Sequence, residues 1–148
     1  MGRARGGPEA DMVADYARRF GRTGRPLGLG PLEVVEVDDR KGGGPAAEAV
    51  LIGRALGAGP LVALDERGDM MSSPDLARRL AQWRDAGQPC AHFVIGGADG
   101  LEPALRARAD LTLSFGPMVW PHMLARVMLA EQLYRAATIL AGSPYHRA

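Results

Sequence analysis

The residues best suited to chemistry lie at the end of the chain, where Tyr145, His146 and Arg147 follow a long apolar segment. A phenol, an imidazole and a guanidinium can together exchange protons and hold an anion. Because chain ends are usually frayed, this concentration of functional groups predicts a site. Further upstream, Glu131 precedes Arg135 by one helical turn, which is the favourable order for an ion pair within a helix.

Two short apolar runs each end in a glycine-containing loop. The loop at 96–100 (GGADG) offers bare backbone that a cofactor can approach, although an ordinary tight turn explains the pattern equally well. The loop at 115–121 (FGPMVWP) carries Met118, Val119 and Trp120 between prolines. These side chains either fold back onto the core or form the wall of a pocket, and an apolar wall with backbone amides suits an adenine ring.

Other kinds of site have less support. The histidines His92, His122 and His146 have no nearby set of carboxylates, so we expect no metal site. Cys90 is the only cysteine, which excludes an internal disulfide, and it should pack as a small buried hydrophobe. Ser114 stands outside any GxSxG motif, which argues against a hydrolase triad.

The composition indicates an ordinary folded domain. The 148 residues are 47% hydrophobic and 24% charged, with a net charge of +1. Six arginines in residues 1–25 either contact phosphate or form a solvated surface. No run approaches the ~18 apolar residues of a membrane span, and the first helix is not preceded by a signal-peptide pattern. We therefore expect a single domain over 1–148, without membrane contact, in the cytoplasm.

The elements that must position these residues alternate between helix and strand. We expect helices at 8–20, 46–56, 103–110 and 121–141, and one that opens at 72–75, is capped by Ser73 and stops at Gly87. Strands are expected at 32–37, 61–65, 92–95 and 111–115. Continuous apolar strands between helices indicate an α/β fold, with a parallel sheet covered by helices on both faces.

The topology selects three loops as a binding site. Ligands of such sheets lie at the carboxyl ends of the strands, which are here the loops after Asp65, at Gly96-Gly97 and at 116–121. The last helix is apolar on more than one face, which favours a homodimer.

Five segments resemble the RlmH family of the SPOUT class. They are ALDERG (63–68), FVIGGADGL (93–101), LSFGPMVWPH (113–122), RVMLAEQLYRA (126–136) and PYHR (144–147). The resemblance covers most of the chain from Pro8 onward. It implies an S-adenosylmethionine-dependent methyltransferase that modifies N3 of a pseudouridine in large-subunit (23S) ribosomal RNA on the assembled ribosome. It also implies a homodimer and a deep C-terminal trefoil knot, whereas periodicity alone predicts an unknotted sheet.

The resemblance also implies the site residues. The cofactor is expected on Leu64, Gly96, Gly97, Phe115, Gly116, Pro117, Met118, Val119, Trp120 and Pro121. The catalytic candidates are Tyr145, His146 and Arg147, with His122 and Arg135. In this hypothesis His146 or Tyr145 contacts the uracil ring, Arg147 and Arg135 hold phosphate or an oxygen, and the proton acceptor stays open. The tail of one subunit can complete the cofactor pocket of the other.

The chain departs from the family at its start. Family members begin with a short apolar strand that leads to a glycine corresponding to Gly2, whereas here Met1 directly precedes it. Either the start codon is assigned too late or the sheet lacks an edge strand. Two other functions stay open: a SPOUT methyltransferase for another RNA, and a catalytically idle ribosome-binding factor. The retained glycine loops and terminal Tyr-His-Arg argue against the idle factor.

Overall fold

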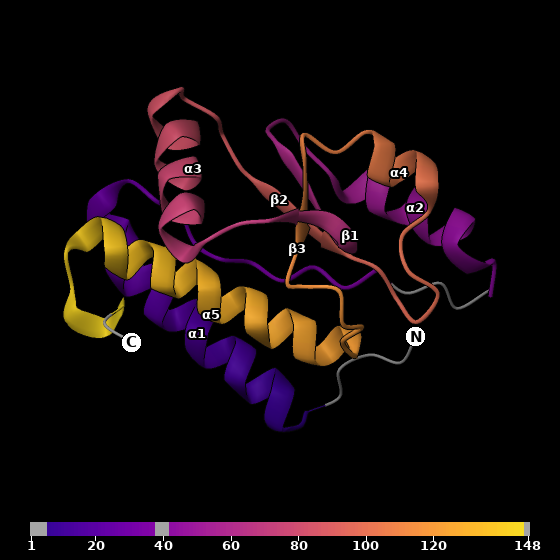
Figure 1. Ribbon diagram of the computed structural model, residues 1–148, viewed down its shortest axis with the longest axis horizontal. Coiled ribbons are helices and arrows are strands. Elements are labelled where there is room, and N and C mark those ends of the chain that lie inside the picture. Colours follow the sequence, from indigo (N-terminus) through magenta and orange to yellow (C-terminus); the bar gives the residue numbers. More distant parts are fainter. Residues whose placement is uncertain (1–5, 38–41, 147–148) are drawn as a thin grey trace. The chain divides into compact units, whose positions relative to one another are not determined.

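A computed structural model describes residues 6–37 and 42–146, and it groups them into two compact units (Figure 1). The sheet unit comprises the described residues of 35–70 and 89–122. The helical unit comprises residues 6–34, 71–88 and those from 123 onward. Residues 1–5, which include Gly2, lie outside the described part of the chain.

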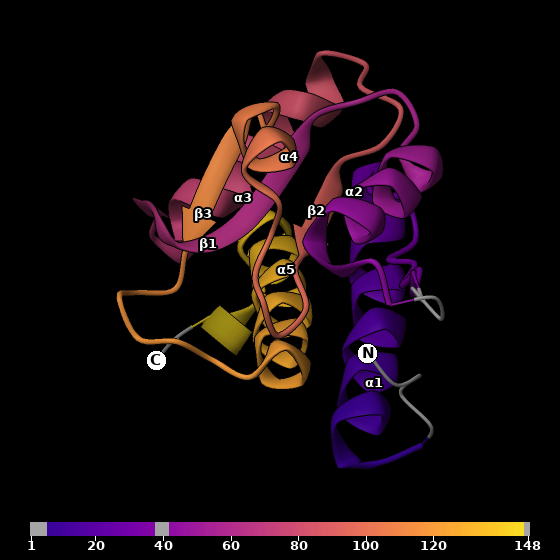
Figure 2. The ribbon, with the colours of Figure 1, turned by 90° about the vertical axis from the view of Figure 1, so that its right-hand side faces the viewer.

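The sheet unit contains a parallel sheet, as predicted. Its described strands are β1 (Leu61–Met70), β2 (His92–Ile95) and β3 (Leu111–Ser114), in the order β2-β1-β3. Figure 2 shows β1 and β3 side by side. The central position of β1 agrees with its continuous apolar run, because a central strand has neighbours along both edges. Val62, near the start of β1, is fully buried.

Two helices of the sheet unit pack on one face of this sheet, α2 (Gly44–Ala55) and α4 (Pro103–Ala107). Leu61 and Ala63 of β1 point to the same face because strand side chains alternate, and they form a buried cluster with Ile52, Val94, Leu101 and Leu105. Helix α4 is shorter than the expected 103–110. It must end early because Asp110 joins the sheet, where its carboxylate accepts a hydrogen bond from Leu61 N at 2.7 Å.

Strand β1 is longer than the expected 61–65 and contains a bulge. Leu64 and Asp69 both pair with Leu113 of β3, so the four residues between them have no pairing partner in β3. Gly68 lies so close to β3 that a Cβ there would be 2.6 Å from the carbonyl oxygen of Thr112. The bulge therefore depends on glycine at this position.

The expected strand at 32–37 is wrong. This segment is extended but pairs with no strand among the described residues, and Val34 and Val35 are 47% and 70% exposed. Its ends pack in different units, Leu32 in the helical unit and Val37 in the sheet unit. A β-branched run forms a strand only where a neighbouring backbone pairs with it, and here the run serves as a connection.

The helical unit contains three α-helices among its described residues. They are α1 (Pro8–Gly24), α3 (Ser73–Asp85) and α5 (His122–Ala141), of which His122 itself belongs to the sheet unit. Two short 3₁₀ helices follow α1 and α5, namely η1 (Arg25–Leu27) and η2 (Pro144–His146). Helices α1 and α5 lie side by side (Figure 1) through Val13, Val127 and Ala130.

Two local predictions need correction. Ser72, and not Ser73, caps α3: its Oγ accepts from Asp75 N at 3.2 Å and donates to the Asp75 carboxylate at 2.7 Å. Ser73 Oγ instead donates to Gln132 at 2.6 Å. Cys90 is exposed rather than buried, because its backbone, and not its thiol, packs against Gly59. In the part of the chain that the structure describes, no helix has the length and apolarity needed to cross a membrane.

Candidate functional site

Two of the three predicted loops begin beside Leu64, where β2 and β3 end, whereas the loop expected after Asp65 is wrong because β1 continues to Met70. Leu64 on the central strand pairs with Ile95 of β2 on one side and with Leu113 of β3 on the other. Gly96 directly follows Ile95, and Phe115 follows Leu113 by two residues. The strand-end rule and the resemblance both selected these two loops, and the register places them at one edge of the sheet.

The loop after β2 is a tight turn. Gly100 N donates to Gly97 O at 3.0 Å, and these two residues form an isolated bridge. Gly96 must lack a side chain, because a Cβ would lie 2.6 Å from the Gly100 carbonyl carbon and 2.7 Å from Leu101 N. The turn interpretation is therefore confirmed. Because glycines have no side chains, the backbone at this strand end is also left uncovered.

The loop after β3 carries its apolar side chains outward. Met118, Val119 and Trp120 are 69%, 80% and 41% exposed, so they do not fold back onto the core. Of the two interpretations given by the sequence, the pocket wall therefore stays. Exposed apolar side chains beside a glycine turn fit an adenosyl group, which has an apolar ring face and polar edges.

Ser114 holds the start of this loop and was missed as a positioning residue. Its hydroxyl is buried and has two carbonyl acceptors within reach of its one proton, Glu66 O at 3.1 Å and Gly116 O at 3.0 Å, and it accepts from Gly116 N at 3.0 Å. Ser114 thereby ties the loop to β1. The sequence signal was a serine immediately before Phe-Gly-Pro, since serine hydroxyls commonly bond to backbone groups nearby.

A second group of predicted residues lies in the helical unit. The Glu131–Arg135 ion pair is confirmed at 2.8 Å, with side chains only 17% and 22% exposed. The Tyr145 hydroxyl donates to Glu131 Oε1 at 3.0 Å, and its ring lies 4.6 Å from the Tyr134 ring and 5.1 Å from the Arg135 guanidinium. Glu131, which the sequence suggested only as an ion-pair partner, therefore anchors the tail.

The electrostatic environment keeps Tyr145 protonated. Burial and the hydrogen bond to the Glu131 carboxylate raise the pKa of Tyr145 to about 12. The hydrogen bond from Arg135 to Glu131 raises the pKa of Arg135, so its guanidinium remains charged. At neutral pH this cluster contains a neutral phenol and a persistent cation.

The structure describes the side chains of His92 and His122 but only part of the end of the tail. His92 begins β2, and its Nε2 lies 3.3 Å from Ala58 O, which supports the structural role expected for it. His122 is the first residue of α5 and is half-buried. His146 ends η2, but its side chain, like the whole of Arg147, lies outside the described part of the chain. Among the described residues, no three His, Cys, Asp or Glu side chains group as a metal site would require.

The sequence also missed an ionic cluster at the bulge of β1. The Asp65 carboxylate accepts hydrogen bonds from Arg67 Nε at 3.0 Å and from Arg106 Nη1 at 2.8 Å. Burial raises the pKa of Asp65, but the bonds from the Arg67 side chain and backbone and from Arg106 outweigh it and lower the pKa to about 2. No spacing rule would have paired Asp65 with Arg106, which lies 41 residues away.

Comparisons with known proteins identify sequence relatives over nearly the whole chain. Residues 1–146 match a family model described as predicted SPOUT methyltransferase. A protein of Dinoroseobacter shibae and one of Cereibacter sphaeroides are each 68% identical to this chain, and one of Roseobacter denitrificans is 66% identical. Each alignment covers 99% of this chain and 95% of the relative, and each relative is named ribosomal RNA large subunit methyltransferase H.

Proposed function

Since the chain belongs to the RlmH family of SPOUT methyltransferases, whose methyl donor is S-adenosylmethionine, we propose that it methylates large-subunit ribosomal RNA. The proposed acceptor is N3 of a pseudouridine on the assembled ribosome, in the cytoplasm. The observation that carries the proposal is the 68% identity over 99% of the chain. The meeting of Leu64 and both predicted loops at one sheet edge supports it.

We propose that the cofactor rests on this sheet edge. Leu64, the turn at Gly96-Gly97 and the loop 115–121 hold it, with Met118, Val119 and Trp120 as the apolar wall. When bound, S-adenosylmethionine supplies an electrophilic methyl group on its sulfonium. Ser114 positions the third loop through its bonds to Glu66 and Gly116. These residues orient the methyl group, because transfer requires the acceptor nitrogen, the methyl carbon and the sulfur to be in line.

The tail supplies the substrate side of the proposed site. N3 of the pseudouridine would have to lose its proton as its bond to the methyl carbon forms and the bond from that carbon to sulfur breaks, with S-adenosylhomocysteine as the leaving group. Tyr145 is a poor acceptor for that proton, because its hydroxyl stays protonated and already donates to Glu131. We therefore assign Tyr145 to contact with the uracil ring and His146 to acceptance of the proton. Arg135, Arg147 and His122 are proposed to hold phosphate or a carbonyl oxygen.

The family also leads us to propose one knotted domain over 1–148 that works as a homodimer. The exposed apolar residues Val119 and Leu124 support the dimer, since Val119 is 80% and Leu124 43% exposed. In the dimer, the tail of one subunit completes the cofactor pocket of the other. The trefoil knot rests on the family match over residues 1–146.

Methyl transfer to ribosomes tests the proposal. Ribosomes from a strain that lacks this modification are incubated with the protein and labelled S-adenosylmethionine, and mass spectrometry of the RNA locates the methyl group. We expect one methyl group on a large-subunit pseudouridine, and none from a variant that ends at Gly142. Undiminished turnover by that variant would remove the tail from the mechanism.

The same samples separate the competing functions. Methyl transfer to a different RNA, with none to ribosomes, would support the alternative SPOUT substrate. Calorimetry with S-adenosylmethionine addresses the idle factor, because a ribosome-binding protein without activity needs no cofactor. Absence of cofactor binding by the intact chain would overturn the enzymatic proposal.

A further inference from the structure

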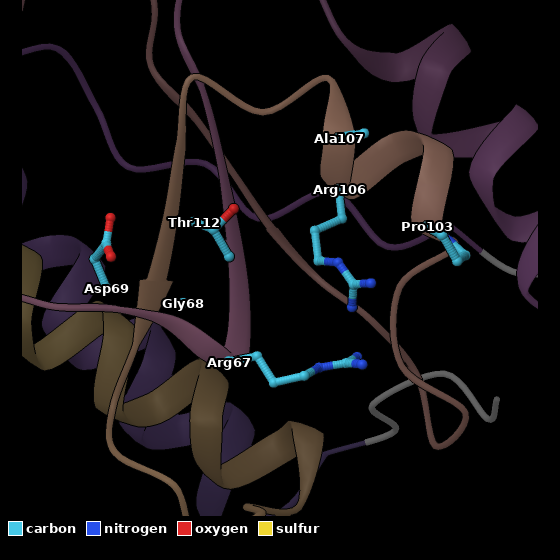
Figure 3. A pocket seen from close by; sticks show the side chains of 7 residues that line it. All are labelled: Arg67, Gly68, Asp69, Pro103, Arg106, Ala107 and Thr112. Carbon is cyan, nitrogen blue, oxygen red and sulfur yellow. The ribbon is translucent and has the colours of Figure 1, made fainter.

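A pocket of about 390 Å³ lies in the sheet unit, between the bulge of β1 and helix α4 (Figure 3). Its volume is at the lower end of the range for small-ligand sites, about 300–1,000 Å³. It is lined by Arg67, Gly68, Asp69, Pro103, Arg106, Ala107 and Thr112. Arg67 and Gly68 belong to the segment after Asp65 that the strand-end rule selected, but none of the residues proposed for the cofactor or the tail lines the pocket.

Two guanidinium groups project into this pocket. Figure 3 shows Arg67, from the bulge, and Arg106, from α4, directed into the same space. Both are held by the Asp65 carboxylate, whose side chain is only 5% exposed. Arg67 uses Nε and Nη2 for this contact and Arg106 uses Nη1. Arg67 Nη1 and Arg106 Nη2 thus lie outside the clamp and can donate to a ligand.

The local charge favours an anion. Within the clamp itself, two guanidinium groups and one carboxylate leave one positive charge. Asp69 also lines the pocket, but its side chain points away from both arginines (Figure 3). Glu66 is exposed and adjacent to Arg67 in sequence. Because the arginines are already ordered by Asp65, little side-chain entropy remains to be lost when a ligand binds.

We propose that this pocket binds a backbone phosphate of the RNA substrate. The proposal rests on the proposed function, which makes the partner a polyanion. Paired guanidinium groups match phosphate oxygens in geometry and charge. The Arg67 side chain is 68% exposed, so a passing RNA strand can reach it from solvent. A chain with a net charge of only +1 has little general attraction for RNA, and a preorganised pocket supplies one defined contact instead.

The salt dependence of RNA binding tests the pocket directly. Fluorescence anisotropy measures binding of a single-stranded ribo-oligonucleotide to the full chain over a series of KCl concentrations. Loss of one phosphate contact should lower the slope of log affinity against log salt by about 0.7. We expect this change and a several-fold weaker affinity for Arg67→Gln, whereas Arg67→Lys retains the charge and should preserve the slope.

Arg78→Gln is the matched control. Arg78 is also 68% exposed and also pairs with an aspartate, Asp75, but it belongs to α3 and does not line the pocket. Equal affinities and equal slopes for Arg67→Gln and Arg78→Gln would overturn the proposal. Melting temperatures of the variants identify any loss of folding, and Arg106→Gln then provides a second variant, in which the slope should fall by about 0.7 if Arg106 contacts the phosphate.

Methyl transfer separates this proposal from the proposed function. With ribosomes as substrate, Arg67→Gln should raise KM several-fold and leave kcat and the affinity for S-adenosylmethionine unchanged. A weaker cofactor affinity would overturn the proposal, because the pocket would then belong to the cofactor site. If the intact chain transfers no methyl group, the proposed function fails, while the oligonucleotide slopes still decide whether the pocket holds phosphate.

Discussion

The chemical state of Tyr145 depends on its burial and on the neighbouring Glu131 carboxylate. The Glu131 carboxylate accepts from the Tyr145 hydroxyl and from Arg135, and both contacts are partly buried. A hydrogen bond to an ionised acceptor is about twice as strong as a neutral one. The protonated phenol of Tyr145 therefore holds the tail in place. A hydroxyl that stays protonated does not act as a base, so we expect Tyr145 to position the tail and not to accept the proton.

Tyr145→Phe should lower kcat about tenfold, because the tail loses a hydrogen bond to a charged group. The shape of the pH–rate profile between pH 6.5 and 9.5 should not change. The folded-state pKa of about 12 lies above the ordinary value of 10.0, so the stabilisation is complete below pH 10 and is lost as the pH rises toward 12. Tyr134→Phe, on the neighbouring ring, is the control. If Tyr145→Phe abolishes an ionisation in this pH range, Tyr145 is the base.

Asp65→Asn should destabilise the protein by about 2 kcal/mol at pH 7, because it leaves two adjacent arginines without a counter-charge. The lowered pKa of Asp65 places its contribution above pH 3.8, and that contribution is lost as the pH falls toward 2. Urea unfolding at several pH values measures both effects. Asp15→Asn is the control, since Asp15 also contacts two arginines, at 3.1 and 2.9 Å, but is 40% exposed. An equal loss for both variants would contradict the importance of burial.

At the scale of elements, short strands position loops through contacts just beyond their ends. Ser114→Ala should weaken S-adenosylmethionine binding about fivefold, because the loop 115–121 loses its tie to β1 at a cost of about 1 kcal/mol. Calorimetry measures the affinity. Ser72→Ala removes the cap of α3, so it should lower stability by about 1 kcal/mol without changing cofactor affinity. Unchanged binding by Ser114→Ala would show that the loop is held in another way.

Replacement of glycine by alanine should change the stability of the protein in opposite directions at Gly96 and at Gly21. Gly96→Ala should destabilise the protein by about 2–3 kcal/mol, since the added Cβ would meet the backbone of Gly100 and Leu101. Gly21→Ala lies in helix α1, where a Cβ meets nothing within 4 Å among the described residues. It should stabilise by about 0.5–1 kcal/mol. The denaturant midpoints of the two variants, compared at equal m-values, measure these opposite changes in the free energy of unfolding. If Gly96→Ala leaves that free energy unchanged, the turn can open to accept a side chain.

The sequence predicts those parts of the fold that depend on local pattern. The apolar runs at 61–65, 92–95 and 111–115 predicted the parallel strands, and the strand-end rule predicted that the loops after β2 and β3 begin beside Leu64. Its third loop, after Asp65, is instead part of β1. The run at 32–37 misled because pairing, and not β-propensity, makes a strand. The bulge of β1 depends on the approach of Gly68 to Thr112. Asp65 contacts Arg106, and Tyr145 contacts Glu131, only because the chain folds back on itself. The spacing of apolar residues in the sequence does not predict such tertiary contacts.

At the scale of the whole molecule, the proposed homodimer predicts that residues of two subunits act together. The loops belong to the sheet unit, and Tyr145 with Glu131 belongs to the helical unit. Exposed Met118 and Val119 beside the strand ends can be covered by cofactor or by a partner subunit. If the loops of one subunit act together with the tail of its partner, a subunit with defective loops and a subunit without a tail should form one active site between them.

Mixing two inactive variants tests this arrangement. The first ends at Gly142 and lacks the tail, and the second carries Met118→Glu, which places a charge in the proposed adenine wall at a position that is 69% exposed. Random exchange of subunits makes half of the dimers mixed, and each mixed dimer has one of its two sites intact. The mixture should therefore regain about a quarter of the wild-type methyl transfer. Sedimentation and mass spectrometry confirm that mixed dimers form. If they form without activity, the tail acts within its own subunit, because only a shared site is restored by exchange.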